Sequence, residues 1–96
     1  MRFTWRASKA ALNFRKHGVR FEEAQTVFEH ETLDRRDDAH SVTEVRCQTL
    51  GPSSAGRLLM VVWTDRTTDA EEVIHLISAR KATPVERRKY RTHTAR

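Results

Sequence analysis

The sequence has a single cysteine, Cys47, so it cannot form an intramolecular disulfide. One cysteine and five scattered histidines also lack the paired ligand spacing of a structural zinc site. No apolar run approaches the roughly 18 residues that a membrane-spanning helix needs, and no secretory signal peptide is recognisable. These absences together indicate a cytoplasmic protein in a reducing compartment, with no membrane partner.

Glycine and proline are scarce, with three and two residues respectively. They stand where an element should begin or end, at Gly18, in the turn 51–56 and at Pro84. No internal repeat or low-complexity tract is present, and 96 residues suffice for one domain with a modest core. We therefore predict a single domain over residues 1–90, followed by a disordered basic tail over residues 91–96.

Acidic residues are absent from the first 20 positions, and charge is unevenly divided along the chain. Residues 1–20 carry six cations, residues 21–79 carry five cations against twelve acids, and residues 80–96 carry seven cations against one acid. If the two basic ends meet in the fold, they form one positive face that suits nucleic acid. Two surface helices with solvated charges explain the same pattern without any ligand.

Hydrophobic periodicity predicts a strand and two helices in the N-terminal part. Residues 2–5 alternate as in a short strand, and a helix that ends at Gly18 follows them. The inward face of this helix is apolar: Ala7, Ala10, Ala11 and Phe14. Its outward face is polar: Lys9, Asn13, Lys16 and His17. A second helix should start near Phe21, and the polar residues 29–41 indicate a loop with room for a short strand near residues 32–33.

The C-terminal half carries the pattern of strands. From Val42 the period changes to two, which predicts a strand with one buried face that includes Cys47. Residues 57–64 are the most apolar run, and residues 73–77 are a second run rich in β-branched residues. Both runs therefore predict buried strands.

The last strand leads directly into a cationic helix. Thr83, Pro84 and Glu86 predict a capping box at the start of this helix. The resulting order is one strand, two helices, three meandering strands and a final helix (β-α-α-β-β-β-α). Segregated helices and consecutive hairpin-linked strands indicate an α+β fold with an antiparallel β-sheet.

An ordered set of short motifs resembles the BrnT family of toxins, from bacterial type II toxin–antitoxin pairs. The motifs run from residue 3 to residue 90: Phe3-x-Trp5, Lys9-Ala10, Asn13, Lys16-His17-Gly18-Val19, Phe21-Glu22-Glu23-Ala24-x-x-Val27-Phe28, His40-Ser41, Glu44, Arg46, Gly56-Arg57, Ile77-Ser78-Ala79-Arg80-Lys81-Ala82, Glu86-Arg87 and Tyr90. The single pieces are weak signals, whereas the ordered set is specific.

The resemblance implies a RelE-like fold and a ribonuclease toxin that blocks translation by cutting RNA. It also implies neutralisation by a BrnA-type antitoxin, in a heterotetramer assembled through antitoxin dimers. Promoter DNA would be bound only through the toxin–antitoxin complex. Enzymes of this kind generally use Arg, Lys and Tyr, so we expect metal-independent RNA cleavage without a cofactor.

The sequence departs from the family pattern in four places. Arg6-Ala7 stands where an Asp-Pro is usual, and Arg20 stands where a Ser is usual, so two helix caps are lost. The turn 65–72 is longer than usual. His75 replaces a usual Arg, so a catalytically weak or inactive homologue, which binds nucleic acid or an antitoxin, is the alternative function.

Four residues are candidates for the chemistry of RNA cleavage. Arg80 and Lys81 would clamp the scissile phosphate, or would form an exposed ion pair at the strand end. His75 could act as general acid or base, or could be a partly buried structural histidine. Arg66 could reach the same phosphate from its turn, or could be an ordinary loop cation.

Further candidates would bind RNA. Arg46 could contact RNA with Glu44 as its orienter, or the two could form a surface salt bridge. Lys9, Lys16 and His17 would follow the RNA backbone, or would only solvate the first helix. Arg87 lies on the cationic last helix, and Tyr90 would stack on a base or pack against the sheet. The larger aromatic residues are expected in the core: Trp5, Phe14, Phe28 and Trp63.

Overall fold

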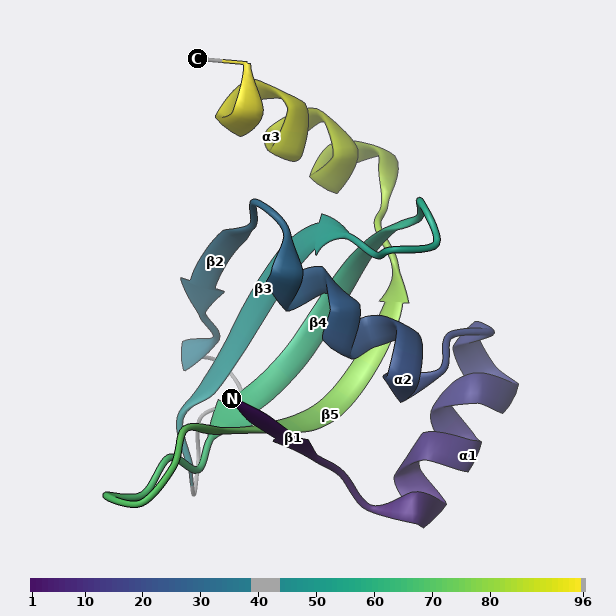
Figure 1. Cartoon of the computed structure of the whole chain (residues 1–96). Helices are drawn as coiled ribbons and strands as arrows, with labels where there is room; N and C mark the ends of the chain where they lie inside the picture. The colour runs from purple at the N-terminus through teal and green to yellow at the C-terminus, as the bar shows by residue number, and fades with distance from the viewer. Residues whose placement is uncertain (39–43, 96) are drawn as a thin grey trace.

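The structure is a computed structural model and describes residues 1–38 and 44–95 (Figure 1). Within these residues the chain forms a five-stranded sheet in the order β1-β5-β4-β3-β2, with three α-helices and one 3-10 helix. The elements are β1 (Arg2–Thr4), α1 (Ala7–His17), α2 (Phe21–Ala24), η1 (Gln25–Glu29), β2 (Leu33–Arg36), β3 (Arg46–Pro52), β4 (Leu58–Asp65), β5 (Val73–Lys81) and α3 (Pro84–Thr94). The predicted α+β class is confirmed.

The sheet is antiparallel except at one edge. The β2–β3, β3–β4 and β4–β5 pairs are antiparallel, whereas β1 pairs with β5 in parallel. The parallel pair was not predicted, because the two strands lie about 70 residues apart in sequence and local patterns carry no information on it. Its register places Thr4 beside His75, which matters for the candidate site below.

The helices α2 and η1 cover one face of the sheet, and α1 lies beside its β5 edge (Figure 1). The main core lies beneath them and consists of Val19, Phe21, Ala24, Val27, Leu59, Val61, Ile74, Leu76 and Ala79. The ring of Phe28 stands between two other aromatic rings, with centroids 5.3 Å from Phe3 and 5.7 Å from Trp63. Tilted and edge-to-face contacts of this kind add to the stabilisation that burial provides.

The opposite face is covered only in part. A smaller core of Leu50, Met60 and Ala82 packs with Leu33, Leu58 and Tyr90, where α3 crosses one end of the sheet. The helix α3 has no buried residue. The remainder of this face, called the open face below, carries mainly polar side chains, of which Thr64 and His75 are buried.

The residues that α1 buries differ from the prediction. Asn13, expected to point outward, is only 6% exposed, whereas Phe14, expected in the core, is 41% exposed. Asn13 Nδ2 donates to the carbonyls of Val19 and Ala79, and its Oδ1 accepts from the Ala79 N–H. The guanidinium of Arg20 lies 4.1 Å from the centroid of the Phe14 ring, a cation–π contact. The helix thus docks on the edge of β5 through an amide rather than an apolar stripe.

The helix ends follow the expected chemistry, except that α3 extends further than predicted. Arg6 and Arg20 stand at N-caps without a side-chain hydrogen bond, as expected from the lost caps. Gly18 ends α1 with φ 69°, in the left-handed region that favours glycine. The capping box of Thr83 and Glu86 is present. Most of the predicted disordered tail is helical instead, because α3 continues to Thr94 and has Ala95 as its C-cap residue.

Candidate active site

A bulge in β5 determines which side chains reach the open face. Ser78 pairs with Val62, but Leu76 pairs with Trp63, so Ile77 is an extra residue in β5. A bulge of one residue changes which face the following side chains occupy. His75 and Arg80 therefore share the open face, although plain alternation would place them on opposite faces.

The cross-strand register arranges the open face in rows. The first row contains Thr4, His75, Thr64 and Arg46. The second row contains Ser78, Val62, Gln48 and Arg35. The third row contains Arg80, Met60, Leu50 and Leu33. Polar groups therefore concentrate at the first row, and apolar groups at the third.

A cationic hollow surrounds His75 in the first row. Its volume is about 240 Å³. It is lined by Arg6, Lys9, Glu44, Arg46, Arg66, His75, Leu76 and Ile77. The structure thus brings together four of the predicted site residues, from α1, β3, β5 and the turn after β4. Four cations face one carboxylate there, which suits a phosphate group.

His75 is held in a defined orientation. Its Nδ1 lies 2.8 Å from the Thr4 hydroxyl, and the residue is 9% exposed. Burial lowers its pKa, with further lowering by Arg66 and Arg6 and an opposing effect of Glu44. Burial and the two arginines therefore favour the neutral form of the imidazole. Because Thr4 uses Nδ1, Nε2 is the ring nitrogen left for proton transfer.

Glu44 forms an ion pair with Arg66, whereas the sequence suggested Glu44 only as the partner of Arg46. Arg66 Nη2 lies 3.5 Å from Glu44 Oε2, and both side chains are partly exposed. The carboxylate therefore orients Arg66 at the rim of the hollow, and an exposed pair of this kind contributes little to stability. The His40-Ser41 motif and the first residues of the strand predicted from Val42 lie outside the described residues, and the described part of this strand is β3.

Arg80 and Lys81 do not form the predicted joint clamp. Consecutive strand residues point to opposite faces, so Lys81 leaves the open face that Arg80 occupies. Arg80 binds Glu86 in a two-pronged ion pair, with Nη1 to Oε1 at 2.8 Å and Nη2 to Oε2 at 2.9 Å. From Thr64 to Met60, β4 advances four residues, about 13 Å. Arg80 is thus two rows from His75, and the ion-pair alternative is what the structure shows for it.

The Arg80–Glu86 pair predicts a specific pH dependence of stability. Arg80 and the Thr83 amide lower the pKa of Glu86 to about 2, from 4.5. A lowered carboxyl pKa stabilises the fold above pH 4.5, and this contribution is lost as the pH falls toward 2. Replacing Glu86 by Gln should cost about 1–2 kcal/mol at pH 7, discounted because Arg80 is partly exposed.

Urea unfolding at pH 7 and pH 3 would measure this contribution. The difference between the wild type and Glu86→Gln should shrink at the lower pH. Glu72→Gln, an exposed change of the same kind, should be close to neutral at both values. An equal difference at both pH values would show that the ion pair does not contribute through its charge.

The remaining predicted RNA-binding residues divide between two places. Lys9, Lys16 and His17 line a second hollow, of about 110 Å³, beside Ile77 and Ser78. Lys9 also lines the hollow of His75, so these two hollows adjoin along α1. This group therefore extends the cationic surface from the open face toward α1.

Arg87 and Tyr90 lie on α3, away from the first row. Arg87 is exposed. The Tyr90 hydroxyl donates to the Glu31 carbonyl at 2.7 Å, its ring joins the smaller core, and burial raises its pKa. Tyr90 therefore has the packing role that was the alternative to base stacking.

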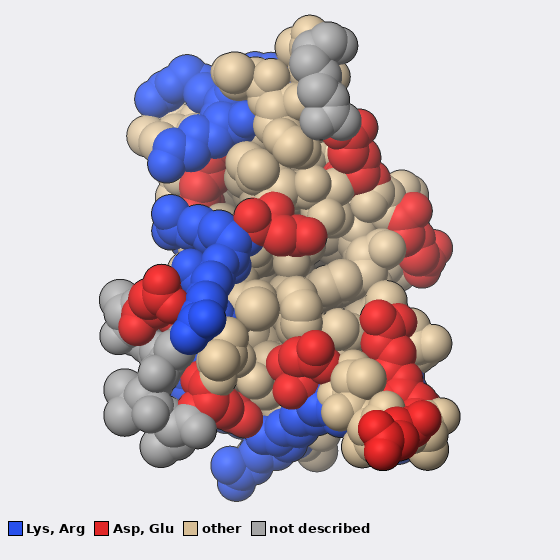
Figure 2. Space-filling view, turned by 90° about the vertical axis from the view of Figure 1, so that its left-hand side faces the viewer, with Lys and Arg blue, Asp and Glu red and all other residues tan. Residues whose placement is uncertain are grey.

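Charge on the molecular surface is divided by sides. Figure 2 shows Lys and Arg mostly along one margin, from the α3 end downward, and mainly Asp and Glu along the opposite margin. The two basic ends do not meet directly, because α1 and α3 lie at different ends of the sheet (Figure 1). The cations around His75 come instead from α1, β3 and two connecting segments.

Two residues that form part of the candidate site were not identified from the sequence. Thr4 orients His75, but only the parallel β1–β5 pairing places it there. Arg6 was recognised only as a lost cap and an added cation, yet it lines the hollow. Arg6 is the N-cap residue of α1, two residues after β1, and only the pairing of β1 with β5 brings it to His75, so no local signal could have identified it.

Neither a metal-binding cluster nor a membrane-spanning helix is present in the part of the chain that the structure describes. No group of three or more His, Cys, Asp or Glu side chains could hold a metal ion among residues 1–38 and 44–95. Over the same residues, no helix has the length and apolar character to cross a membrane.

Comparisons with known proteins identify relatives of this chain. Residues 5–86 match a protein family described as "Ribonuclease toxin, BrnT, of type II toxin-antitoxin system". The fold is similar to the crystal structure of the Brucella abortus ribonuclease toxin BrnT, with a TM-score of 0.60 and 20% identity. The match covers 86% of this chain and 97% of the Brucella chain. No curated protein matches the sequence.

Proposed function

We propose that this chain, which belongs to the BrnT family of ribonuclease toxins from type II toxin–antitoxin systems, cleaves RNA in the hollow around His75. The observation that carries the proposal is the assembly of four cations around one imidazole that Thr4 holds in a defined orientation. RNA cleavage through the 2′-hydroxyl needs a base, phosphate stabilisation and an acid for the leaving oxygen. This hollow contains a candidate for each.

The roles follow from the chemistry of the side chains. With Nδ1–H donating to the Thr4 hydroxyl oxygen, His75 Nε2 would be the unprotonated nitrogen that takes the proton of the 2′-hydroxyl, whose oxygen then attacks the neighbouring phosphorus. Arg46 and Arg66 would stabilise the negative charge on the phosphoryl oxygens. The bond to the 5′-oxygen then breaks, and this oxygen needs a proton. Lys9 is the candidate donor, because an arginine does not release its proton.

We further propose that this cleavage needs no metal ion. The hollow has one carboxylate, Glu44, against four cations, so a divalent cation would be repelled there. The purified chain should therefore cleave RNA equally well in excess chelator. A substrate with 2′-O-methyl groups throughout should resist cleavage, because the nucleophile is blocked. Cleavage that chelator abolishes would contradict the mechanism, and cleavage of the methylated RNA would exclude the 2′-hydroxyl route.

The partner that the family implies is an antitoxin, and we propose a BrnA-type chain in a heterotetramer. The open face offers it a cationic surface with partly covered apolar residues at the α3 end. Expression of the chain by itself should arrest bacterial growth with cut RNA, and co-expression of the antitoxin should restore growth. Intact RNA and normal growth with a folded, well-expressed chain would favour the inactive-homologue alternative.

RNA affinity should depend steeply on salt. If the cations of the hollow and of α1 hold phosphates, the logarithm of affinity falls with the logarithm of salt concentration, by about 0.7 per phosphate on single strands. Lys16→Ala, which removes one cation from α1, should reduce this slope by about one phosphate contact. Fluorescence anisotropy with an uncleavable methylated RNA measures the slope. A salt-independent affinity would contradict binding through phosphates.

A further inference from the structure

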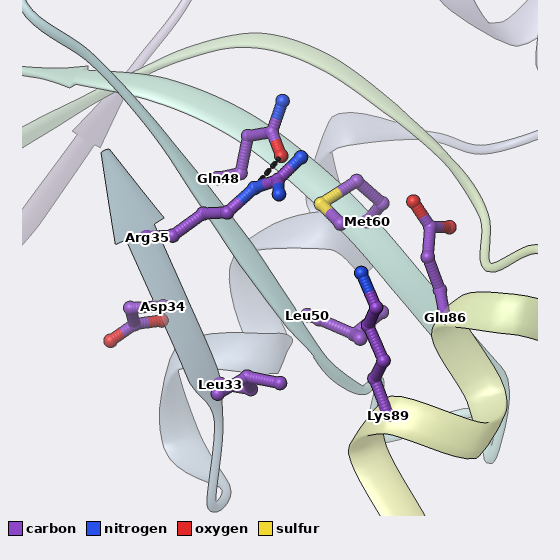
Figure 3. Close-up of a pocket in the computed structure, with 8 residues that line it drawn as sticks. All are labelled: Leu33, Asp34, Arg35, Gln48, Leu50, Met60, Glu86 and Lys89. Carbon is purple, nitrogen blue, oxygen red and sulfur yellow. Dashed lines mark hydrogen bonds between the residues drawn. The ribbon is translucent and has the colours of Figure 1, made fainter. Parts of the chain in front are cut away.

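A further hollow, at the α3 end of the open face, is lined by more apolar side chains than the hollow of His75. It lies where β2, β3 and β4 meet the start of α3 and has a volume of about 200 Å³ (Figure 3). Its floor is apolar and consists of Leu33, Leu50 and Met60. Its rim carries Arg35, Glu86 and Lys89, while Asp34 points away from it. Charged groups around an apolar floor indicate a ligand that is flat and apolar on its faces and polar at its edges.

Two of the three rim groups, Arg35 and Glu86, are held in place by hydrogen bonds. Arg35 Nε donates to Gln48 Oε1 at 2.8 Å, which brings its guanidinium over the floor (Figure 3). Glu86 is fixed by Arg80 and the Thr83 amide, and its lowered pKa keeps it ionised. Lys89 extends toward the floor from α3. Donors and an acceptor thus stand at different sides of one small hollow.

The shape and chemistry match one nucleobase. The volume is below the roughly 300 Å³ of the smallest common drug-sized sites, so a single heterocycle suits it better than a larger ligand. A guanidinium plane and a thioether are favourable surfaces for stacking a base. Guanine offers O6 and N7 to cationic donors, and its N–H groups can donate to a carboxylate. Adenine presents a donor where guanine has O6.

We propose that this hollow is a nucleobase subsite for the RNA substrate, with guanine as its preferred base. The inference rests on the proposed function, because it assigns a place on the open face to part of the same RNA. The floor residues Leu50 and Met60 lie about 13 Å from Arg46 and Thr64 along β3 and β4. A short single strand can span that distance, so its base would be held here while a phosphate enters the hollow of His75.

Methionine methyl NMR provides a direct test. The chain has two methionines, and Met60 belongs to the floor of the hollow whereas Met1 is exposed. With ¹³C-methyl methionine, guanosine monophosphate should shift the Met60 signal in a saturable manner. Ribose 5-phosphate, which carries the phosphate without a base, should leave the signal in place. Adenosine monophosphate should bind about tenfold more weakly than guanosine monophosphate.

Two neighbouring arginines provide a matched pair of variants. Arg35→Ala should weaken the binding of guanosine monophosphate by about tenfold. Arg36→Ala removes the same charge from the same strand on the opposite face, where Arg36 pairs with Asp38, and should leave binding unchanged. Lys89→Ala, on an exposed helix position, repeats the test independently of β2. An equal effect of Arg35→Ala and Arg36→Ala would show a general charge effect and overturn the subsite.

The outcomes separate the subsite from the proposed function. RNA cleavage by the same preparation, without any effect of guanosine monophosphate on Met60, would overturn only the subsite. A Met60 shift of equal size with ribose 5-phosphate would also overturn it, because the phosphate would then be the ligand. A base-dependent Met60 shift in a chain that does not cleave RNA would support the subsite and contradict the nuclease.

Discussion

Replacing His75 by alanine should lower the rate of RNA cleavage by about 100- to 10,000-fold, the range for loss of a general base. The expected loss is large because His75 is the one imidazole that lines the cationic hollow, with Nδ1 fixed by Thr4. Single-turnover cleavage of a defined RNA measures the rate. His30→Ala, at the exposed end of η1, should cleave at the wild-type rate.

The pH profile separates a chemical role from a structural role of His75. A base must be neutral, so the rate should rise with pH and reach a plateau once the imidazole has lost its proton. Since burial lowers the His75 pKa from 6.5, the half-maximal rate should lie below that pH. Thr4→Val keeps the imidazole but removes its hydroxyl partner, and should lower the rate without removing the pH dependence. A slow His75→Ala variant with an unchanged profile would show that His75 only supports the fold.

Arg80→Ala offers a contrast, because the structure places Arg80 two rows from the hollow and in an ion pair with Glu86. Its main cost should be in stability, together with a moderate effect on RNA affinity. If Arg80→Ala abolished cleavage in a folded protein while His75→Ala did not, the scissile phosphate would lie at the α3 end of the open face.

Replacing Asn13 by leucine should reduce the free energy of unfolding by about 3–5 kcal/mol. The amide makes three buried hydrogen bonds, two of them to the backbone of Ala79 at the edge of β5. Leucine would leave the Ala79 N–H, the Ala79 carbonyl and the Val19 carbonyl without this partner, at about 1–3 kcal/mol each, and the burial of its own apolar side chain would offset part of this sum. Urea unfolding measures the difference. The loss would be a large share of the roughly 5–15 kcal/mol that stabilises a typical domain.

Arg15→Leu is the matched control for Asn13→Leu. It places the same side chain on the exposed face of α1, where it should change stability by less than about 0.5 kcal/mol. A similar small effect of Asn13→Leu would show that water or a shifted backbone satisfies the β5 edge. Loss of the docking of α1 would also disturb the hollow, because α1 carries Lys9.

The last strand shows how far the sequence could predict the site. The β-branched run predicted β5, and the capping signals predicted the start of α3 at Pro84. Arg80 and Lys81 were predicted to form one clamp, whereas the alternation of strand residues places their side chains on opposite faces of β5. The bulge at Ile77 could not be predicted, since it depends on the register with β4 and not on a local pattern.

The first helix shows a feature that the sequence did not predict, which is the face that the helix buries. Its boundaries followed from periodicity and Gly18, but its buried face was misassigned. A helix made mostly of alanine and cations has a weak apolar preference, so its orientation is set by its partner. That partner is the polar edge of β5, which Asn13 can satisfy and a phenylalanine cannot.

The sequence by itself determined the α+β class, most element boundaries and the capping box, because these depend on local spacing and composition. Its ordered motifs also carried the resemblance to the family. Only the tertiary structure decided which cations share a site. The parallel β1–β5 pair brings Thr4 to His75, the bulge brings His75 and Arg80 to one face, and α1 brings Lys9 to β5. Each of these depends on contacts between residues far apart in the chain, which hydrophobic periodicity does not encode.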